Sequence, residues 1–266
     1  MTVFRSFLLC FSACAVSGSG SAAPEPMGVG IKPTTPELPG TNWRVHDGTR
    51  PQPKVVRPEG IVAIPAPEDA VVLFDGTSVE KWVTKKKGEP CRWIVKDGVL
   101  TANKHDIVTK QEFRDVQVHL EWRLPADRAV NGQKGGNSGI FLMDRYEIQI
   151  LQSHKNETYP DGTAGAVYGQ HPPLVNATLP QGEWQSYDIV FKAPRFKKDG
   201  SLASPAVVTV IHNGVVVQNA TQIQGTSVYR KLASYDKNHP ERAPIRLQWH
   251  GDPVQYRNVW VREIGG

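Results

Sequence analysis

The stretch from Asn137 to Leu151, NSGIFLMDRYEIQIL, combines acid–base and amide side chains with a strand pattern. Two apolar runs flank Asp144-Arg145, which predicts a strand, a tight turn and a second strand. Side chains alternate between the two faces of a strand, so Glu147 and Gln149 share one face, opposite Tyr146, Ile148 and Ile150. A carboxylate beside an amide can move protons and bind hydroxyl groups.

Two further strand patterns carry long polar side chains in the same alternation. In Val116 to Leu124 the polar set is Gln117, His119, Glu121 and Arg123, and in Ile245 to His250 it is Arg246, Gln248 and His250. We expect these strands and the Glu147 strand to share one polar face, with donors and acceptors suited to sugar hydroxyls. A solvated sheet face that carries Glu and His by chance is the alternative.

The titratable members of this set are Glu121, Glu147 and His250, and a carboxylate on such a face can act as a general base or acid. Two carboxylates are the usual equipment of glycosidases, but their separation cannot be read from the sequence, so retention and inversion both stay open. His250 precedes the turn Gly251-Asp252-Pro253, where an imidazole at a strand end can reach a ligand. Asn137 follows Gly135-Gly136 without the helix and Lys-Ser/Thr of a phosphate loop, so its amide is free for another ligand.

Strand patterns follow one another from about Val71 to Ile264, with turn signals such as Asp97-Gly98 and Asn213-Gly214. No segment shows a convincing 3.6-residue apolar period. We therefore predict an all-β fold for residues 70–266, a two-sheet antiparallel jelly-roll sandwich.

The first 69 residues have a different composition. Residues 1–23 have a basic residue, an apolar run too short for a membrane span and a small-residue stretch, which predicts a signal peptide and a secreted or periplasmic protein. Lipid attachment at Cys14 is a minor alternative. Residues 24–69 are dense in proline and are expected to be an extended spacer or an arm along the domain. Cys91 is then the one cysteine of the mature chain, which excludes an intramolecular disulfide.

The distribution of charge limits which classes of binding partner are expected. The formal net charge is +5, with the basic residues scattered beside turns, so a nucleic-acid footprint is not expected. The chain has no transmembrane run and no coiled-coil heptads, and no protein partner is predicted. An oligosaccharide or glycoside is the expected ligand.

Many ordered motifs resemble the 3-keto-disaccharide hydrolase domain family. They cover nearly all of residues 71–264 and include LFDGTSVEKW (73–82), GNSGIFL (136–142), YEIQIL (146–151), AVYGQHPPLVNA (166–177), LQWHG (247–251) and YRNVWVREI (256–264). The resemblance implies a concanavalin-A-like jelly roll that acts on glycosides whose C3 hydroxyl has been oxidised to a ketone. The ketone acidifies the C2 hydrogen, so a base can remove it, the C1 group leaves, and water then adds.

By matching motif positions, the resemblance implies proton transfer by Glu147 and His250, with Glu121 as a third candidate. Gln149, Gln248, Asn137 and Arg257 would bind the sugar or stabilise the enolate. A divalent cation could polarise the keto oxygen, but no spacing demonstrates its ligands. At two positions where members of the family frequently have Asp, this chain has Gln152 and Trp249. A non-catalytic carbohydrate-binding module is the alternative function.

Overall fold

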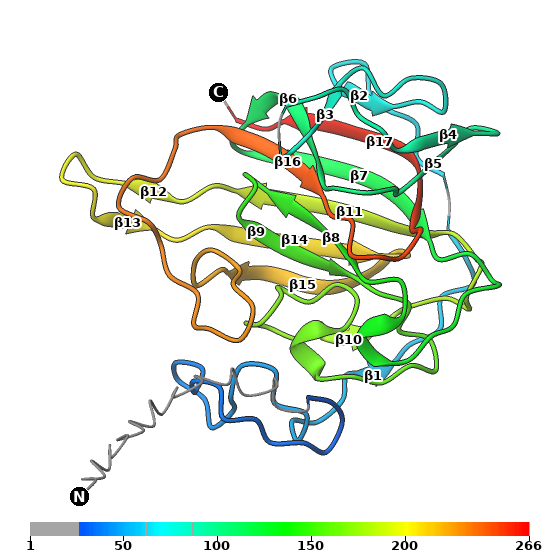
Figure 1. Cartoon of the computed structure of the whole chain (residues 1–266). Helices are drawn as coiled ribbons and strands as arrows, with labels where there is room; N and C mark the ends of the chain where they lie inside the picture. Colours follow the sequence, from blue (N-terminus) through cyan, green and yellow to red (C-terminus); the bar gives the residue numbers. More distant parts are fainter. Residues whose placement is uncertain (1–26, 62, 87, 266) are drawn as a thin grey trace, which may run out of the picture.

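Two stacked β-sheets form the body of the computed structural model, which describes residues 27–61, 63–86 and 88–265 (Figure 1). The larger sheet has eight strands in the order β15-β14-β11-β7-β17-β5-β4, and β2 also pairs with β17. Its strands are β2 (Val71–Phe74), β4 (Ile94–Lys96), β5 (Val99–Thr101), β7 (Val116–Arg123), β11 (Gln185–Lys192), β14 (Val207–His212), β15 (Val215–Gln222) and β17 (Gln255–Glu263).

The smaller sheet has five strands in the order β3-β6-β16-β8-β9. They are β3 (Trp82–Thr84), β6 (Ile107–Phe113), β8 (Ser138–Leu142), β9 (Tyr146–Ile150) and β16 (Ala243–Leu247). Two small sheets pair β1 (Lys54–Val55) with β10 (Val175–Asn176) and β12 (Arg195–Phe196) with β13 (Leu202–Ser204). The helical content of the described residues is two short 3₁₀ helices, η1 (Gly132–Lys134) and η2 (Pro160–Gly162).

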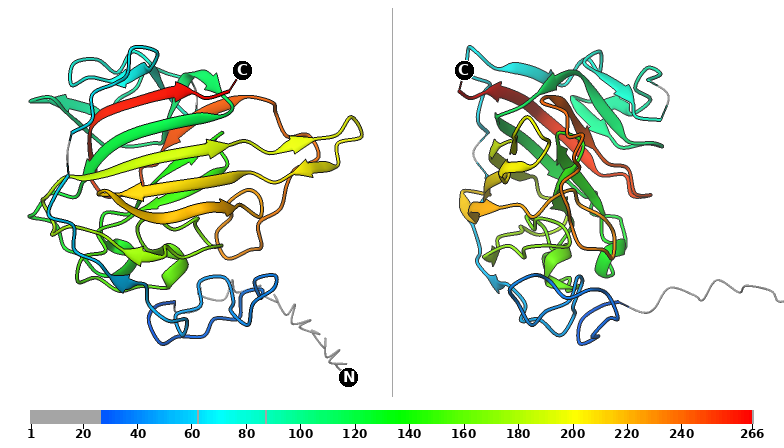
Figure 2. Two further views of the ribbon diagram at one scale, coloured as in Figure 1. Left: turned by 180° about the vertical axis from the view of Figure 1, so that it is seen from behind. Right: turned by 90° about the vertical axis from the view of Figure 1, so that its left-hand side faces the viewer.

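All strand pairs within the two large sheets are antiparallel. The edge-on view in Figure 2 shows the two layers, and the apolar face of each packs against the other. Leu120 and Trp122 from β7 and Tyr146 and Ile148 from β9 belong to one buried cluster. The architecture confirms an all-β sandwich of antiparallel sheets and is consistent with a jelly roll.

The predicted tight turns form where the sequence indicates them. Asp97-Gly98 and Asn213-Gly214 all have positive φ, as hairpin turns of this kind require. The turn between β8 and β9 lies one residue earlier than predicted. Its positive-φ residues are Met143 and Asp144, and the Arg145 N–H donates to the Leu142 carbonyl oxygen.

The proline-rich segment contacts the sandwich at several points. His46 is fully buried, Gln52 donates to the Thr158 carbonyl oxygen, and β1 pairs with β10. The Ile64 carbonyl oxygen accepts hydrogen bonds from Asn258 and Trp260. The described part of the segment thus contacts the domain at these points. The predicted signal peptide, residues 1–23, lies outside the described residues, in which no helix is long and apolar enough to cross a membrane.

Candidate active site

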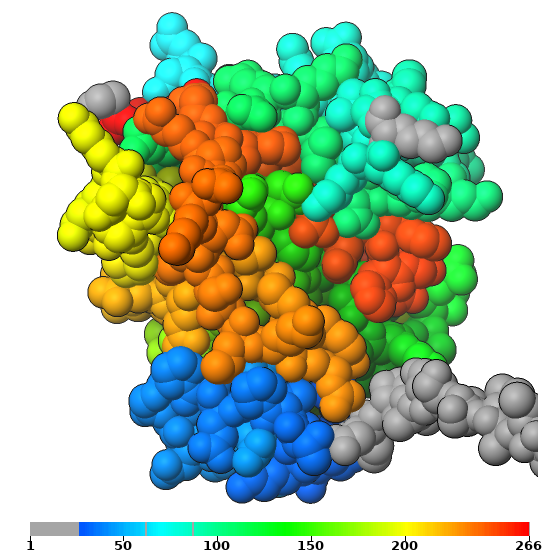
Figure 3. Space-filling model, turned by 60° about the vertical axis from the view of Figure 1, so that its left-hand side comes forward, coloured from blue at the N-terminus to red at the C-terminus, as the bar shows by residue number. Residues whose placement is uncertain are grey.

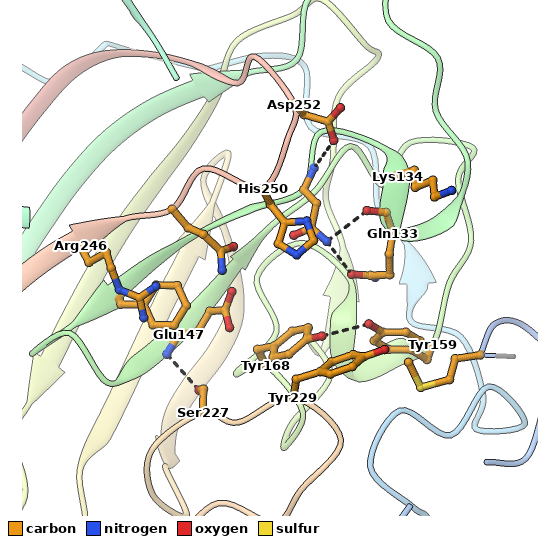
Figure 4. A pocket seen from close by; sticks show the side chains of 14 residues that line it. Gln133, Lys134, Glu147, Tyr159, Tyr168, Ser227, Tyr229, Arg246, His250 and Asp252 are labelled. Carbon is orange, nitrogen blue, oxygen red and sulfur yellow. Dashed lines mark hydrogen bonds between the residues drawn. The ribbon is translucent and has the colours of Figure 1, made fainter. Parts of the chain in front are cut away.

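A pocket of about 980 Å³ lies on the outer face of the smaller sheet, within the size range of ligand pockets. Its floor comes from β8, β9 and β16, whose alternate side chains point away from the core. The loops after β7, β9, β15 and β16 and the start of the described N-terminal segment form its walls. The lining residues are Met27, Gln133, Lys134, Asn137, Phe141, Glu147, Tyr159, Tyr168, Ser227, Tyr229, Arg246, Gln248, His250 and Asp252 (Figure 4).

Glu147 is the carboxylate at the bottom of the pocket. Its side chain is buried, with 5% of the residue exposed, and it makes no hydrogen bond or ion pair with the described residues. Desolvation by burial raises the pKa of Glu147 to about 8, against the opposing charge of Arg246 and with the aid of Asp106. An unpaired carboxylate with a pKa near neutrality is suited to proton transfer.

Gly139 on β8 makes room for this carboxylate. A Cβ atom built at Gly139 would lie 2.5 Å from Glu147 Oε1 and 3.0 Å from an edge carbon of the Phe141 ring. The Glu147 side chain therefore lies across the neighbouring strand, in a space that any larger residue at position 139 would fill.

Arg246 is held beside Glu147 by two aspartates. Its Nε donates to Asp144 Oδ1 at 2.5 Å and its Nη1 to Asp106 Oδ2 at 2.8 Å, while the guanidinium carbon lies 3.3 Å from the Phe141 ring centroid. The Nη2 group makes no hydrogen bond with the described residues, so it is available to an anionic oxygen in the pocket. Asp106 also accepts from the Trp249 N–H and thereby fixes the end of β16.

Amide side chains form the polar part of the floor. Asn137 Nδ2 and Gln149 Nε2 both lie 3.2 Å from Gln133 Oε1, to which they donate. Gln149 stands behind the lining residues, and Gln248 lines the pocket. Oε1 of Gln149 and Oε1 of Gln248 are buried without a hydrogen-bond partner. Such acceptors indicate a ligand that brings its own donors, as sugar hydroxyls do.

His250 lies at the mouth of the pocket, exposed, and makes no hydrogen bond or ion pair with the described residues. The loop that carries it is fixed by Asp252, whose Oδ2 accepts the N–H groups of Gly136 and Asn137 at 3.0 Å. This contact joins the loop after β16 to the loop before β8, so His250 and Asn137 are positioned together. An imidazole there can donate or accept a proton.

A cluster of aromatic rings forms the remaining wall. Tyr159 and Tyr168 share a hydroxyl–hydroxyl hydrogen bond of 3.0 Å, and Tyr229 stands beside them (Figure 4). Burial raises the pKa of both Tyr159 and Tyr168, so their hydroxyl groups stay protonated. His46 packs behind the three rings, with centroid distances of 4.2 to 5.7 Å.

The structure corrects the prediction that one polar face unites all three strands. Glu121 on β7 and Arg257 on β17 belong to the larger sheet, whereas Glu147 lies on the smaller one. Both sheets turn their apolar faces into the shared core, so their polar faces point in opposite directions. Alternation along a strand shows which side faces the core but not which sheet the strand joins. Glu121 and Arg257 therefore do not line the pocket.

Glu121 is instead part of a fully paired network on the far side. Arg257 Nε donates to its Oε2 at 2.5 Å, Asn258 Nδ2 donates to its Oε1 at 2.9 Å, and His119 lies 3.7 Å away. A register shift in β17 and the positive φ of Asn258 bring two consecutive side chains to the same carboxylate. Burial opposes ionisation, but the bonds from His119, Asn258 and Arg257 together lower the pKa of Glu121 to about 2.

Four predicted residues thus line the pocket, namely Glu147, His250, Gln248 and Asn137, and Gln149 supports it from behind. The two departures from the family pattern, Gln152 and Trp249, lie outside the lining. Gln152 is buried and bonds the backbone of His154, while Trp249 packs against the core. Neither departure therefore removes a group from the pocket.

The sequence interpretation missed Arg246 as a site residue and all of the aromatic wall. Arg246 stands in the same alternation as Gln248, so its signal was present. Tyr159, Tyr168 and Tyr229 lie in irregular loops, where no periodic pattern relates them to the strands. The described residues bring no three His, Cys, Asp or Glu side chains together as a metal site.

A pocket with one unpaired carboxylate among the described residues, on the outer face of an antiparallel sandwich, defines a small-ligand site with acid–base groups. The chain belongs to the family of 3-keto-alpha-glucoside-1,2-lyase-like domains, whose model matches residues 69–262. This match confirms the family recognised from the sequence motifs.

Solved structures agree with this assignment. A candidate glycosyl hydrolase from Parabacteroides distasonis is 42% identical over 85% of this chain and 99% of its own, with a TM-score of 0.72. A second candidate glycosyl hydrolase from the same organism is 25% identical over 73% of this chain and 99% of its own, with a TM-score of 0.54. None of the curated proteins compared with the chain matches it. The family and these relatives indicate a glycosyl hydrolase-like, carbohydrate-active protein.

Proposed function

We propose that the protein cleaves the glycosidic bond of 3-keto-glucosides, with Glu147 as the base that removes the C2 proton. The observation that carries the proposal is the buried Glu147 carboxylate, which has no partner among the described residues and a pKa of about 8. A base whose pKa lies close to the working pH transfers protons efficiently. The family match supports the choice of a ketone at C3 in the substrate.

In the first step, Glu147 takes the C2 proton and the C–H electron pair moves into an enolate on the C3 oxygen. Arg246 stabilises this negative charge, because its Nη2 group is unpaired among the described residues and its other nitrogens are held by Asp106 and Asp144. Arg246 thus takes the role that the sequence assigned to Arg257. A fixed cation needs little reorganisation when the charge develops.

In the second step, the enolate collapses to a C1–C2 double bond and the C1–O bond breaks. His250 donates a proton to the departing oxygen, which leaves as an alcohol. Water then adds across the C1–C2 double bond, with its hydroxyl at C1 and its proton at C2, so the sum of the steps is hydrolysis. Gln248 and Asn137, which line the pocket, hold the sugar hydroxyls, and Gln149 supports the floor from behind through Gln133.

The test is turnover of methyl 3-keto-α-glucoside by the wild-type protein, Glu147→Gln and His250→Ala, with product formation followed by NMR. We expect turnover by the wild type and a loss of about 10² to 10⁴ in kcat for Glu147→Gln. Glu80→Gln, at an exposed glutamate that does not line the pocket, is the matched control and should keep full activity. Circular dichroism shows whether each variant is folded.

Two outcomes would contradict the proposal. Full activity of folded Glu147→Gln would remove Glu147 from the chemistry. Saturable binding of the glucoside by the wild type without any turnover would leave the non-catalytic carbohydrate-binding module as the function.

A further inference from the structure

The two ends of the pocket differ in chemistry. Lys134 and Asp252 stand on one side, and the rings of Tyr159, Tyr168 and Tyr229 are grouped on the other (Figure 4). Glu147, only 5% exposed, lies at the bottom between them. A sugar whose C2 reaches Glu147 therefore enters deeply, and the group attached to its C1 must extend toward the mouth. The cavity of about 980 Å³ is larger than one sugar ring requires.

Tyr229 is the exposed member of the aromatic wall. More than half of its surface, 54%, is accessible, whereas Tyr159 is almost completely buried. An exposed ring at the mouth of a pocket offers a flat apolar face to a ligand. Figure 3 shows the loop that carries Tyr229 lying directly against the N-terminal segment, at the edge of the molecule.

The loop of residues 223–235 holds Tyr229 in a fixed relation to Glu147. The Thr226 N–H donates to the Ser234 carbonyl oxygen, which closes the loop at its base. Ser227 donates its N–H to the Arg145 carbonyl oxygen, and its Oγ accepts the N–H of Glu147 at 3.1 Å. Tyr229 is two residues further along, so the ring and the carboxylate are joined through one short stretch of bonded backbone.

The N-terminal segment supports the ring from behind. The His46 ring centroid lies 5.7 Å from that of Tyr229, and the His46 N–H donates to Asp161 Oδ2 at 2.8 Å. Because His46 is fully buried between the rings and Asp161, the aromatic wall is ordered before any ligand arrives. A preorganised stacking face loses little entropy on binding.

We propose that Tyr229 forms the subsite for the leaving group and selects glycosides whose C1 substituent has a ring with a flat apolar face. This inference rests on the proposed function and names the substrate class of the same pocket. Both a second sugar ring and an aryl ring present such a face, and each stacks on a tyrosine. A small alkyl substituent reaches no part of the ring and gains nothing from it.

The experiment compares 3-keto-α-glucosides of methanol, 4-nitrophenol and glucose as substrates for the wild type, Tyr229→Ala and Tyr229→Phe. The ratio of wild-type to variant kcat/KM is taken within each substrate, so that intrinsic leaving-group reactivity cancels. We expect Tyr229→Ala to lower kcat/KM about 5- to 10-fold for ring-bearing leaving groups and less than about 2-fold for methanol. Tyr229→Phe should keep the wild-type values.

Val228→Ala is the matched control, since Val228 is an exposed neighbour on the same loop and does not line the pocket. A loss confined to the nitrophenyl or to the glucosyl substrate identifies which ring the subsite accepts. Equal losses for all three substrates, or no loss for any, would overturn the inference.

Calorimetric binding of the corresponding unoxidised glucosides gives a readout that does not require turnover. If the wild type turns over none of the three ketones, the proposed function fails. The subsite still stands if Tyr229→Ala weakens binding of the ring-bearing glucosides alone, and it falls if binding is unchanged.

Discussion

Glu147 and Glu121 have similar positions in their strands, since each follows an apolar core residue and is itself almost inaccessible to solvent. Their surroundings are opposite. Glu121 receives bonds from Arg257 and Asn258 and has a pKa of about 2, whereas Glu147 has no such partner and a pKa of about 8. Burial is common to both, so the presence or absence of paired donors decides whether a buried carboxylate serves structure or chemistry.

Glu147, the unpaired buried carboxylate, lies on the smaller sheet, where the pocket is. On the larger sheet a bulge in β17 delivers two side chains to one carboxylate, and the network also joins His119 to Asp188. Gln248 Oε1, in the floor of the same pocket, is also buried without a hydrogen-bond partner among the described residues. An unpaired carboxylate beside an unpaired amide oxygen in the pocket floor is a place where a substrate can supply the missing hydrogen bonds.

The largest expected difference between the two carboxylates is in rate. Glu147→Gln should reduce kcat by about 10² to 10⁴, while Glu121→Gln, measured per folded molecule, should leave kcat within about 2-fold of the wild type. Steady-state kinetics at a temperature where both variants are folded makes the comparison. A large kcat loss in Glu121→Gln would show that the far network acts on the pocket.

Stability should show the reverse order. Glu121→Gln removes the charged partner of Arg257 and one of the two carboxylates beside His119, and we expect a loss of about 2 to 3 kcal/mol in the free energy of unfolding. Glu147→Gln removes a carboxylate that is costly to ionise and should not destabilise the protein at pH 8. Urea denaturation gives the free energy of unfolding of both variants. Similar losses of this free energy in the two variants would contradict the distinction between a structural and a chemical carboxylate.

The pH dependence separates the two groups further. The folded-state pKa of Glu147 is raised from 4.5 to about 8, so its ionisation costs stability increasingly as the pH rises through this window. The folded-state pKa of Glu121 is lowered to about 2, so its contribution is full above pH 4.5 and is lost as the pH falls toward 2. Thermal scans should therefore show the stability of Glu147→Gln rising relative to that of the wild type between pH 5 and 9. The stability difference between Glu121→Gln and the wild type should disappear as the pH falls toward 2.

The same shift governs activity. Because Glu147 must be ionised to act as a base, kcat/KM should rise as the pH rises toward about 8. A pH–rate profile of the wild type tests this, and a profile already flat from pH 5 upward would assign the base to another group.

A smaller effect is expected from Gly139→Ala. The added Cβ would lie 2.5 Å from Glu147 Oε1, so the carboxylate must move while the strand pairing of β8 is kept. We expect a loss of about 10-fold or more in kcat with the fold retained, since a displacement of about 1 Å can cost as much as 10²-fold in rate. Kinetics together with circular dichroism checks this, and unchanged kcat would mean that the position of the carboxylate is not critical.

Much of the fold could be predicted from local patterns. Alternation located β7, β9 and β16, and Asp97-Gly98 and Asn213-Gly214 marked hairpins that the structure contains. The strands β3, β12 and β13 were not predicted, because two or three residues are too short to show a period. The sequence also could not predict which of the two sheets each strand joins, since this depends on which strands pair across long distances in the sequence.

The candidate site was predicted only in part, for related reasons. Glu147, Gln248 and His250 belong to strands or strand ends with a clear pattern, and they meet in the pocket. Glu121 shows the same pattern on the other sheet, so a pattern of this kind cannot distinguish a catalytic carboxylate from a structural one. The tyrosine wall and His46 come from loops and from the N-terminal segment. No local sequence pattern indicates how these segments pack.

Exchange of the C2 hydrogen tests the central claim, that Glu147 removes this proton, most directly. A 3-keto-glucoside deuterated at C2 would be incubated with the wild type and with Glu147→Gln, and its reaction followed by NMR. We expect a primary isotope effect on kcat/KM for the wild type and retention of the C2 deuterium in the presence of Glu147→Gln. Cleavage by the wild type with the C2 deuterium still in place would contradict proton abstraction at C2 and with it the role of Glu147.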